Sequence, residues 1–233
     1  CFKQNEKVEV KSTMITDRID KKYISNAIKE LASQLGVRDD IPKVSVSNML
    51  SAGRIKESIE IMANYLGLPI TVNLSYVEAN YEYSNAGNRF NSSALVATDD
   101  TGKGAGGIVA QVSIPSYLPL LGTPRMQGFP ISVKISSNCQ KHPRAFLAIM
   151  AHELSHIVLQ SILHTKKDNE FYTDLTAMIL GFSNVMRNGR KVVKTSNTYT
   201  LAGTMVETNT TTYGYLTDEL FDFAYHKIKN III

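Results

Sequence analysis

The segment that follows Pro143 constrains the fold most, because it combines a long apolar run with two histidines. Apolar residues fill 146–150 and 157–159, which predicts a helix buried in the core rather than a solvated surface helix. Pro143 suits the first turn of such a helix, where its missing N–H group leaves no hydrogen bond unmade. His152 and His156 lie between the two apolar stretches, so we expect both imidazoles inside the protein.

The spacing of His152 and His156 places both imidazoles on one helical face, about one turn apart. Two imidazoles in this position can bind one zinc ion, and Glu153 stands beside the first, where it can take a proton from a metal-bound water. The alternative is a core helix whose two histidines are satisfied by other protein groups. Because burying two histidines and a carboxylate without partners is costly, we predict that the two histidines are metal ligands.

A second acidic pattern follows the histidines, and catalytic zinc usually has three protein ligands and one open position. Glu170 and Asp174 are one turn apart near the start of another predicted helix, which Asp168 or Asn169 can cap. An acidic first turn is also what the helix dipole favours in a protein without a metal. His164, in the loop between the two helices, is a weaker candidate for the third ligand.

The two patterns together, His-Glu-x-x-His and then Glu-x-x-x-Asp, resemble the signature of the gluzincin metallopeptidases. The resemblance covers about residues 142–181. It implies that Glu170 is the third zinc ligand and that Asp174 orients His152 through its other ring nitrogen. Glu170 comes only fourteen positions after His156, closer than in thermolysin-like enzymes, so Asp174 remains an alternative third ligand.

The rest of the chain predicts an α+β fold, with a small, mostly antiparallel sheet packed on a helical layer that carries the two histidines. The resemblance makes this architecture zincin-like. In zincins an edge strand borders the substrate cleft, and residues 131–136 are a candidate for it, with an ordinary interior strand as the alternative. The periodicity predicts helices over 16–35, about 48–66 and from Thr217 onward, strands over 70–76, 95–97, 108–114 and 131–136, and a hairpin of 191–198 with 204–212.

We divide the 233 residues into a polar tether over 1–13 and a single zincin-like metallopeptidase domain over 14–233. Residues 78–93 are rich in Asn, Ser and Tyr and predict an irregular loop. The glycine-rich segment 101–107 predicts a flexible hairpin or flap. A phosphate-binding loop is disfavoured there, because a strand-like run follows where a helix would be needed.

Composition limits the classes of partner that we expect for the protein and the cellular compartments that suit it. The net charge of +4 is mild, and the basic cluster over 187–194 is expected to be the solvated end of a helix, so we predict no nucleic-acid partner. No apolar run is long enough to cross a membrane. The two cysteines, Cys1 and Cys139, suit the reducing cytoplasm. Alternatively, Cys1 before a polar stretch suits a lipid-anchored protein of the bacterial cell envelope.

These observations predict a zinc-dependent metallopeptidase that acts on a peptide or protein substrate, with Zn²⁺ as its cofactor. His152, His156 and Glu170 would hold the ion, and Glu153 would act as general base toward a zinc-bound water. The downstream residues that could stabilise the oxyanion, as a Tyr or His does in other zincins, are Tyr213, Tyr215 and His226.

Two other functions remain open. The chain could be a metal-binding regulatory or scaffolding module that recognises a partner without cutting it, although such a site would have no need of Glu153. It could also be a regulatory peptidase that cuts one specific partner protein.

Overall fold

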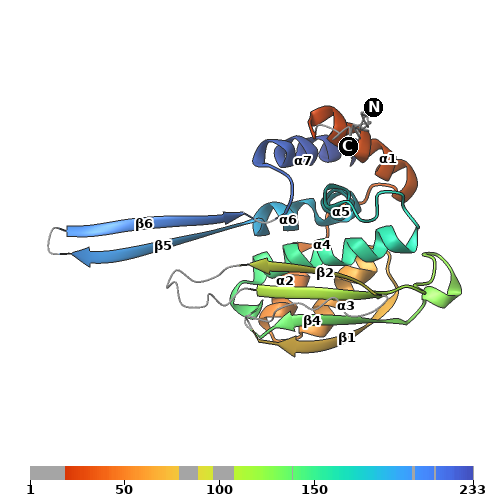
Figure 1. Ribbon diagram of the computed structural model, residues 1–233, viewed down its shortest axis with the longest axis horizontal. Helices are drawn as coiled ribbons and strands as arrows, with labels where there is room; N and C mark the ends of the chain where they lie inside the picture. Colours follow the sequence, from red (N-terminus) through yellow and green to blue (C-terminus); the bar gives the residue numbers. More distant parts are fainter. Residues whose placement is uncertain are drawn as a thin grey trace, which may run out of the picture.

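The helix that carries both histidines, α4 (Pro143–Ser161), lies between a sheet and a second group of helices (Figure 1). It is buried at nearly every position from Ala145 to Ser161, as its apolar sequence predicts. The computed structural model describes residues 19–78, 89–96, 108–137, 139–200, 203–212 and 214–232. The other helices are α1 (Lys21–Leu35), α2 (Lys43–Ser51), α3 (Ile55–Tyr65), α5 (Glu170–Ala177), α6 (Ser183–Gly189) and α7 (Asp218–Ile232).

The larger sheet has four strands in the order β1–β4–β3–β2. β1 runs parallel to β4, while the pairings of β4 with β3 and of β3 with β2 are antiparallel. The described residues therefore form a mixed α+β fold whose small sheet is mostly antiparallel, as predicted. The strands are β1 (Ile70–Val77), β2 (Arg89–Val96), β3 (Ile108–Pro115) and β4 (Phe129–Ser136).

The strand proposed as a candidate for the edge of the sheet, β4, is an interior strand between β1 and β3. Its inward-facing side chains, Ile131, Val133 and Ile135, are fully buried. β2 is at an edge instead, and it begins at Arg89, so the irregular loop expected over 78–93 was too long. The polar middle of β2, Asn-Ser-Ser, hides this strand from an analysis of hydrophobic pattern.

Two predicted helices have different bounds in the structure. The first begins at Lys21 rather than at residue 16, because Asp20 caps it by accepting a hydrogen bond from the Tyr23 N–H at 2.8 Å. The helix predicted over about 48–66 is two helices, α2 and α3. Gly53, with φ of +79°, turns the chain between them.

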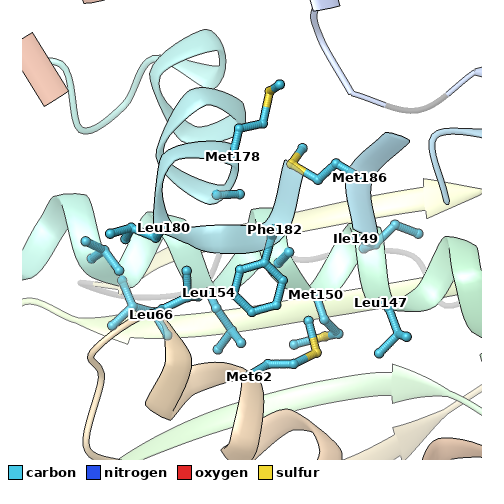
Figure 2. Close-up of a cluster of buried hydrophobic side chains, with 14 of the residues drawn as sticks. Met62, Leu66, Leu147, Ile149, Met150, Leu154, Met178, Leu180, Phe182 and Met186 are labelled. Atoms are coloured by element: carbon cyan, nitrogen blue, oxygen red, sulfur yellow. The ribbon is translucent and has the colours of Figure 1, made fainter. Parts of the chain in front are cut away.

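A core of large side chains joins α4 to the helices around it (Figure 2). Phe182 lies near Met62 of α3 and near Met150 and Leu154 of α4, and all four side chains are fully buried. Burial of one such side chain stabilises the fold by about 1.5–3 kcal/mol. Since Phe182 belongs to the segment after α5, this packing also fixes α5 relative to α4.

The chain between α5 and α6 is a kinked π-helical turn, η3 (Met178–Phe182). Gly181 has φ of +97° there, and a Cβ at this position would lie 2.4 Å from the carbonyl oxygen of Asp39. The Gly181 carbonyl accepts a hydrogen bond from the Ile41 N–H at 2.9 Å. The segment before α2 therefore crosses η3 in direct backbone contact, which requires glycine.

The predicted hairpin is confirmed as β5 (Lys191–Thr200) paired antiparallel with β6 (Gly203–Thr212), and it projects from the body of the protein (Figure 1). The final helix, α7, follows. Thr217 caps it as expected, with Oγ1 accepting a hydrogen bond from the Leu220 N–H at 3.3 Å.

Short 3-10 turns are η1 (Pro124–Met126) and η2 (Cys139–Lys141). The tether over 1–13 and the glycine-rich segment 101–107 lie outside the described residues. Among the helices that the structure describes, none combines the length and the apolar character needed to span a bilayer.

Candidate metal centre

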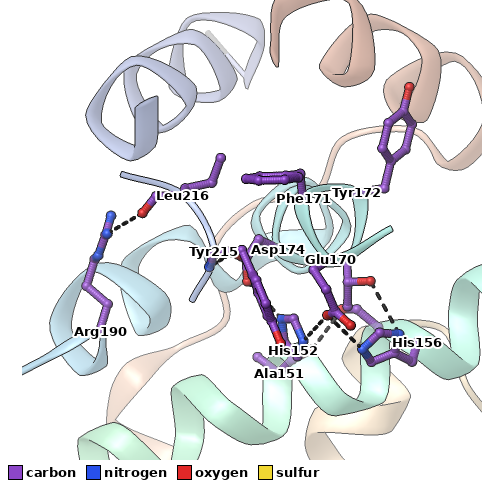
Figure 3. Close-up of polar contacts among 12 residues, drawn as sticks. Ala151, His152, His156, Glu170, Phe171, Tyr172, Asp174, Arg190, Tyr215 and Leu216 are labelled. Atoms are coloured by element: carbon purple, nitrogen blue, oxygen red, sulfur yellow. Dashed lines mark hydrogen bonds and ion pairs between the residues drawn. The ribbon is translucent and has the colours of Figure 1, made fainter. Parts of the chain in front are cut away.

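The two histidines of α4 converge on one carboxylate oxygen (Figure 3). Nε2 of His152 lies 3.0 Å from Oε2 of Glu170, and Nε2 of His156 lies 3.3 Å from the same oxygen. The two imidazole rings are 4.9 Å apart between centroids and nearly perpendicular. The i, i+4 spacing on the helix, read from the sequence, therefore brings the two nitrogens to one point.

Glu170 reaches this point because α5 begins beside α4 after a tight connection. The His164 N–H donates to the Leu159 carbonyl at 3.0 Å, and the Asn169 N–H donates to the Lys166 carbonyl at 3.0 Å. Asn169 is the cap of α5, and its side-chain oxygen accepts hydrogen bonds from the first backbone N–H groups of the helix. The short spacing between the motifs is thus spanned by successive turns.

Asp174 lies on the other side of the His152 ring. Its Oδ1 is 2.8 Å from Nδ1 of His152, and the carboxylate is almost fully buried. A carboxylate on Nδ1 holds a proton there and makes Nε2 the nitrogen that can offer a lone pair to a metal ion. Asp174 therefore lies where it can orient the histidine, and Glu170 lies beside the Nε2 atoms of both histidines.

His156 has a corresponding partner that the sequence analysis did not identify. Oγ1 of Thr173 lies 3.4 Å from Nδ1 of His156 and 3.3 Å from the carbonyl oxygen of Asn169. If the hydroxyl donates to that carbonyl, its oxygen can accept the Nδ1 proton, which makes Nε2 the nitrogen that can bind a metal ion. The signal in the sequence was the position of Thr173 one turn after Glu170, on the same face of α5.

Burial and hydrogen bonding shift the pKa values of the three side chains in this cluster in different directions. Burial would lower the pKa of His152, but its hydrogen bonds to Asp174 and Glu170 outweigh burial and raise that pKa to about 10. Burial lowers the pKa of His156. Burial would raise the pKa of Glu170, but hydrogen bonds from the two histidines lower it to about 2. In the absence of a metal, His152 is therefore protonated on both ring nitrogens, and it donates one hydrogen bond to Asp174 and one to Glu170.

Glu153 is also almost fully buried, directly after His152 in α4. Its negative charge contributes to raising the pKa values of His152 and Tyr215, so its carboxylate is close enough to both side chains for an electrostatic interaction. Action as a general base would also require that the carboxylate come within hydrogen-bond reach of a metal-bound water.

Tyr215 is the oxyanion candidate that the structure brings to the cluster. Its ring stacks on His152 with centroids 5.7 Å apart and an interplanar angle of 24°. Burial and the charges of Glu170 and Glu153 raise the pKa of its phenol. His226 lies elsewhere, in a surface groove with Lys21 and Glu219. Tyr213 is outside the described residues.

Two other side chains of types that can bind metals, His164 and Cys139, lie away from the cluster. Nδ1 of His164 accepts a hydrogen bond from the Lys166 N–H at 3.0 Å, and its Nε2 lies 3.4 Å from Glu30. Cys139 is buried in η2, where burial raises the pKa of its thiol to about 11. A thiol with a raised pKa is a poor metal ligand, because thiolate is the form that binds.

The basic cluster over 187–194 also differs from expectation. Arg190 was expected at a solvated helix end but is only 6% exposed. Its guanidinium lies over the Phe221 ring, 4.2 Å from the centroid, and contacts Asp218 at 3.2 Å. Arg187 lies over the Tyr225 ring. Both arginines therefore contact α7, but Arg190 is buried there, whereas Arg187 remains exposed.

The donor set fits a zinc ion. His152, His156 and Glu170 each offer one ligand atom, and these three atoms lie within 4.8 Å of one another. Two imidazole nitrogens and a carboxylate oxygen are ligands that Zn²⁺ commonly takes in catalytic sites. The side chain of Glu170 is 31% exposed, so the cluster is reachable from solvent on that side.

Comparison with protein-family models, with curated proteins and with solved structures finds no significant match to this chain.

Proposed function

We propose that this protein is a zinc metallopeptidase of the gluzincin type with a zincin-like fold. The observation that carries the proposal is the single oxygen, Oε2 of Glu170, that lies 3.0 Å from Nε2 of His152 and 3.3 Å from Nε2 of His156. His152, His156 and Glu170 would hold the ion. The solvent-facing side of Glu170 would leave room for a water and a substrate carbonyl.

When bound, zinc supplies a Lewis acid that lowers the pKa of a water and polarises a peptide carbonyl. Glu153 accepts the proton of the attacking water and donates it to the leaving amine. Asp174 keeps the proton of His152 on Nδ1, which leaves Nε2 as the ligand atom. The phenol of Tyr215 stays protonated, because its pKa is raised, and offers a neutral donor to the developing oxyanion.

The edge strand β2 supports a peptide as the substrate. Among the described strands it pairs with β3 alone, and it lies beside α4 (Figure 1). An extended peptide can add to such an edge through backbone hydrogen bonds, without demands on its side chains. A peptide held there would run alongside the helix that carries Glu153.

The variant Glu153→Gln tests the proposal, because it removes the base and leaves the metal ligands. Zinc content should stay near one ion per chain, while hydrolysis of unfolded casein falls by roughly 10²–10⁴-fold. Ser155→Ala is the matched control: Ser155 is buried on the same helix and its hydroxyl donates to the Ala151 carbonyl at 2.7 Å. Full activity in Glu153→Gln, or a wild-type protein that binds no zinc, would overturn the proposal.

A regulatory peptidase with one partner protein is the second candidate, and the hairpin of β5 and β6 favours it. The hairpin projects from the body, and its two ends meet the protein at Arg190 and Gly214, close to the cluster. A projecting two-stranded ribbon offers unpaired strand edges to a partner. Incubation with casein and with a cell extract separates the two: general cleavage supports the first candidate, and loss of a single extract protein supports the second.

A further inference from the structure

The turn after the hairpin, residues 214–216, contacts the carboxylate oxygen of Asp174 that His152 does not bind. The Tyr215 N–H donates a hydrogen bond to Oδ2 of Asp174 at 2.8 Å, while Oδ1 of the same carboxylate binds His152 at 2.8 Å. A Cβ at Gly214 would lie 3.1 Å from Oδ2 of Asp174. Both oxygens of the carboxylate are therefore held, one by the histidine and one by this turn.

Arg190 fixes the 214–216 turn through a hydrogen bond. Nη2 of Arg190 donates a hydrogen bond to the Leu216 carbonyl at 2.7 Å, and the guanidinium is buried between the end of α6 and the start of α7 (Figure 3). We propose that Arg190 is a positioning residue of the metal centre, which fixes the 214–216 turn and through it the carboxylate of Asp174. This inference rests on the proposed zinc site.

Close packing of the preceding residue against α4 fixes the backbone at Arg190. It follows Gly189, which packs so closely on α4 that a Cβ there would lie 2.2 Å from the Arg144 carbonyl oxygen. A closed series of contacts therefore begins at the backbone of α4 and continues through Arg190 to Leu216 and Tyr215. It then reaches Asp174 and returns to α4 at His152. Such a closed path restricts the rotation of the Asp174 carboxylate and of the imidazole it orients.

If Arg190 had a purely structural role, its loss would have a different effect on the protein. In that case Arg190 would join α6 to α7, and its loss would lower the stability of the fold without changing the metal centre. Asn184 provides the comparison, because it also joins these helices: its side-chain oxygen accepts a hydrogen bond from the Tyr225 hydroxyl at 2.7 Å. Within the part of the chain that the structure describes, the side chain of Asn184 forms hydrogen bonds with Asp40 and Tyr225 and not with the 214–216 turn or Asp174.

The experiment measures the zinc affinity of purified full-length variants by competition with a chromophoric chelator. Arg190→Met should weaken zinc binding roughly tenfold, within the range found for the loss of residues that support metal ligands. Asn184→Ala should bind zinc as the wild type does, even where its melting temperature falls by a similar amount. Equal affinities for Arg190→Met and the wild type would overturn the inference.

The double variant Arg190→Met/Asp174→Ala tests whether Arg190 acts through Asp174. If it does, the double variant should bind zinc no more weakly than Asp174→Ala alone, because the two losses are then not additive. Losses that multiply would overturn the inference. The absorption spectrum of the cobalt-loaded protein gives a second readout, and Arg190→Met should alter it while Asn184→Ala should not.

Gly214→Ala keeps the test decisive if Arg190→Met does not fold. This variant removes no charge and no donor, but its Cβ would press on Asp174, and its φ of +85° disfavours alanine. Zinc affinity should fall as for Arg190→Met, and an unchanged affinity would overturn the inference. A wild-type protein that binds no zinc would instead overturn the proposed function, so the two failures are distinguishable.

Discussion

Nδ1 of His152 lies 2.8 Å from Oδ1 of Asp174, a buried carboxylate that comes from a different helix. This contact holds a proton on Nδ1 and leaves Nε2 beside Glu170. It supports the proposal that Asp174 orients His152 while Glu170 binds the metal, whereas the sequence had left Asp174 open as an alternative third ligand.

The two carboxylates should therefore differ in their effect on zinc affinity. Asp174→Ala should weaken zinc binding by roughly 10–100-fold, as expected for a group that orients a ligand. Glu170→Ala removes a ligand and should weaken binding further. Chelator competition measures both, with Asp168→Ala as the control, since Asp168 contacts Gln160 on the exposed side of the same connection. Equal losses, or a larger loss for Asp174→Ala, would contradict the assignment.

Zinc binding should release a proton at neutral pH. The pKa of His152 is raised to about 10, so the ring is protonated there in the metal-free protein, whereas the pKa of His156 is lowered and its ring is already neutral. Affinity should rise about tenfold per pH unit between roughly pH 6 and 8. Calorimetry in buffers of different ionisation enthalpy measures the released protons, and a value near zero would contradict this prediction.

The stability of the metal-free protein should change with pH in the opposite direction. The pKa of His152 is about 10 in the folded state against an ordinary value of 6.5. Its contribution to stability is therefore complete below pH 6.5 and is lost as the pH rises through 10. Urea unfolding of the chelator-treated protein from pH 6 to 10 should show this decline, and His152→Gln should flatten it.

Thr173→Val should weaken zinc binding several-fold, because it removes the oxygen 3.4 Å from Nδ1 of His156 while keeping the shape of the side chain. Thr176→Val is the matched control. Thr176 is also fully buried on α5, and among the described residues its hydroxyl has no hydrogen-bond partner. The control should bind zinc normally, and a control that loses as much affinity as Thr173→Val would point to general disruption of α5.

Gly181→Ala should destabilise the fold by about 2–4 kcal/mol, because φ is +97° and the new Cβ would lie 2.4 Å from the Asp39 carbonyl oxygen. Gly36→Ala separates the two causes: Gly36 has φ of +73°, but nothing lies within 4 Å of its Cβ position. Gly36→Ala should lower the free energy of unfolding by only about 1 kcal/mol. Thermal and urea unfolding measure both variants, and equal losses would show that the contact with Asp39 contributes nothing.

The sequence by itself determined the features that depend on local spacing. His152 and His156 are four positions apart on an apolar helix, so their convergence follows from helical geometry, and the caps at Asn169 and Thr217 follow from side-chain chemistry. The strand at 70–77 and the hairpin of β5 and β6 were visible from alternation and turn residues.

Tertiary structure alone decided the features that depend on residues distant in the chain. Alternation marks β4 as a strand, but its interior place depends on β1 and β3, which no local pattern specifies. The task of Asp174 depends on how α5 crosses α4. The burial of Arg190 depends on α7, which begins more than 20 residues later. A charged residue in a polar segment predicts exposure, and only a packed neighbour that supplies its hydrogen bonds can make burial favourable.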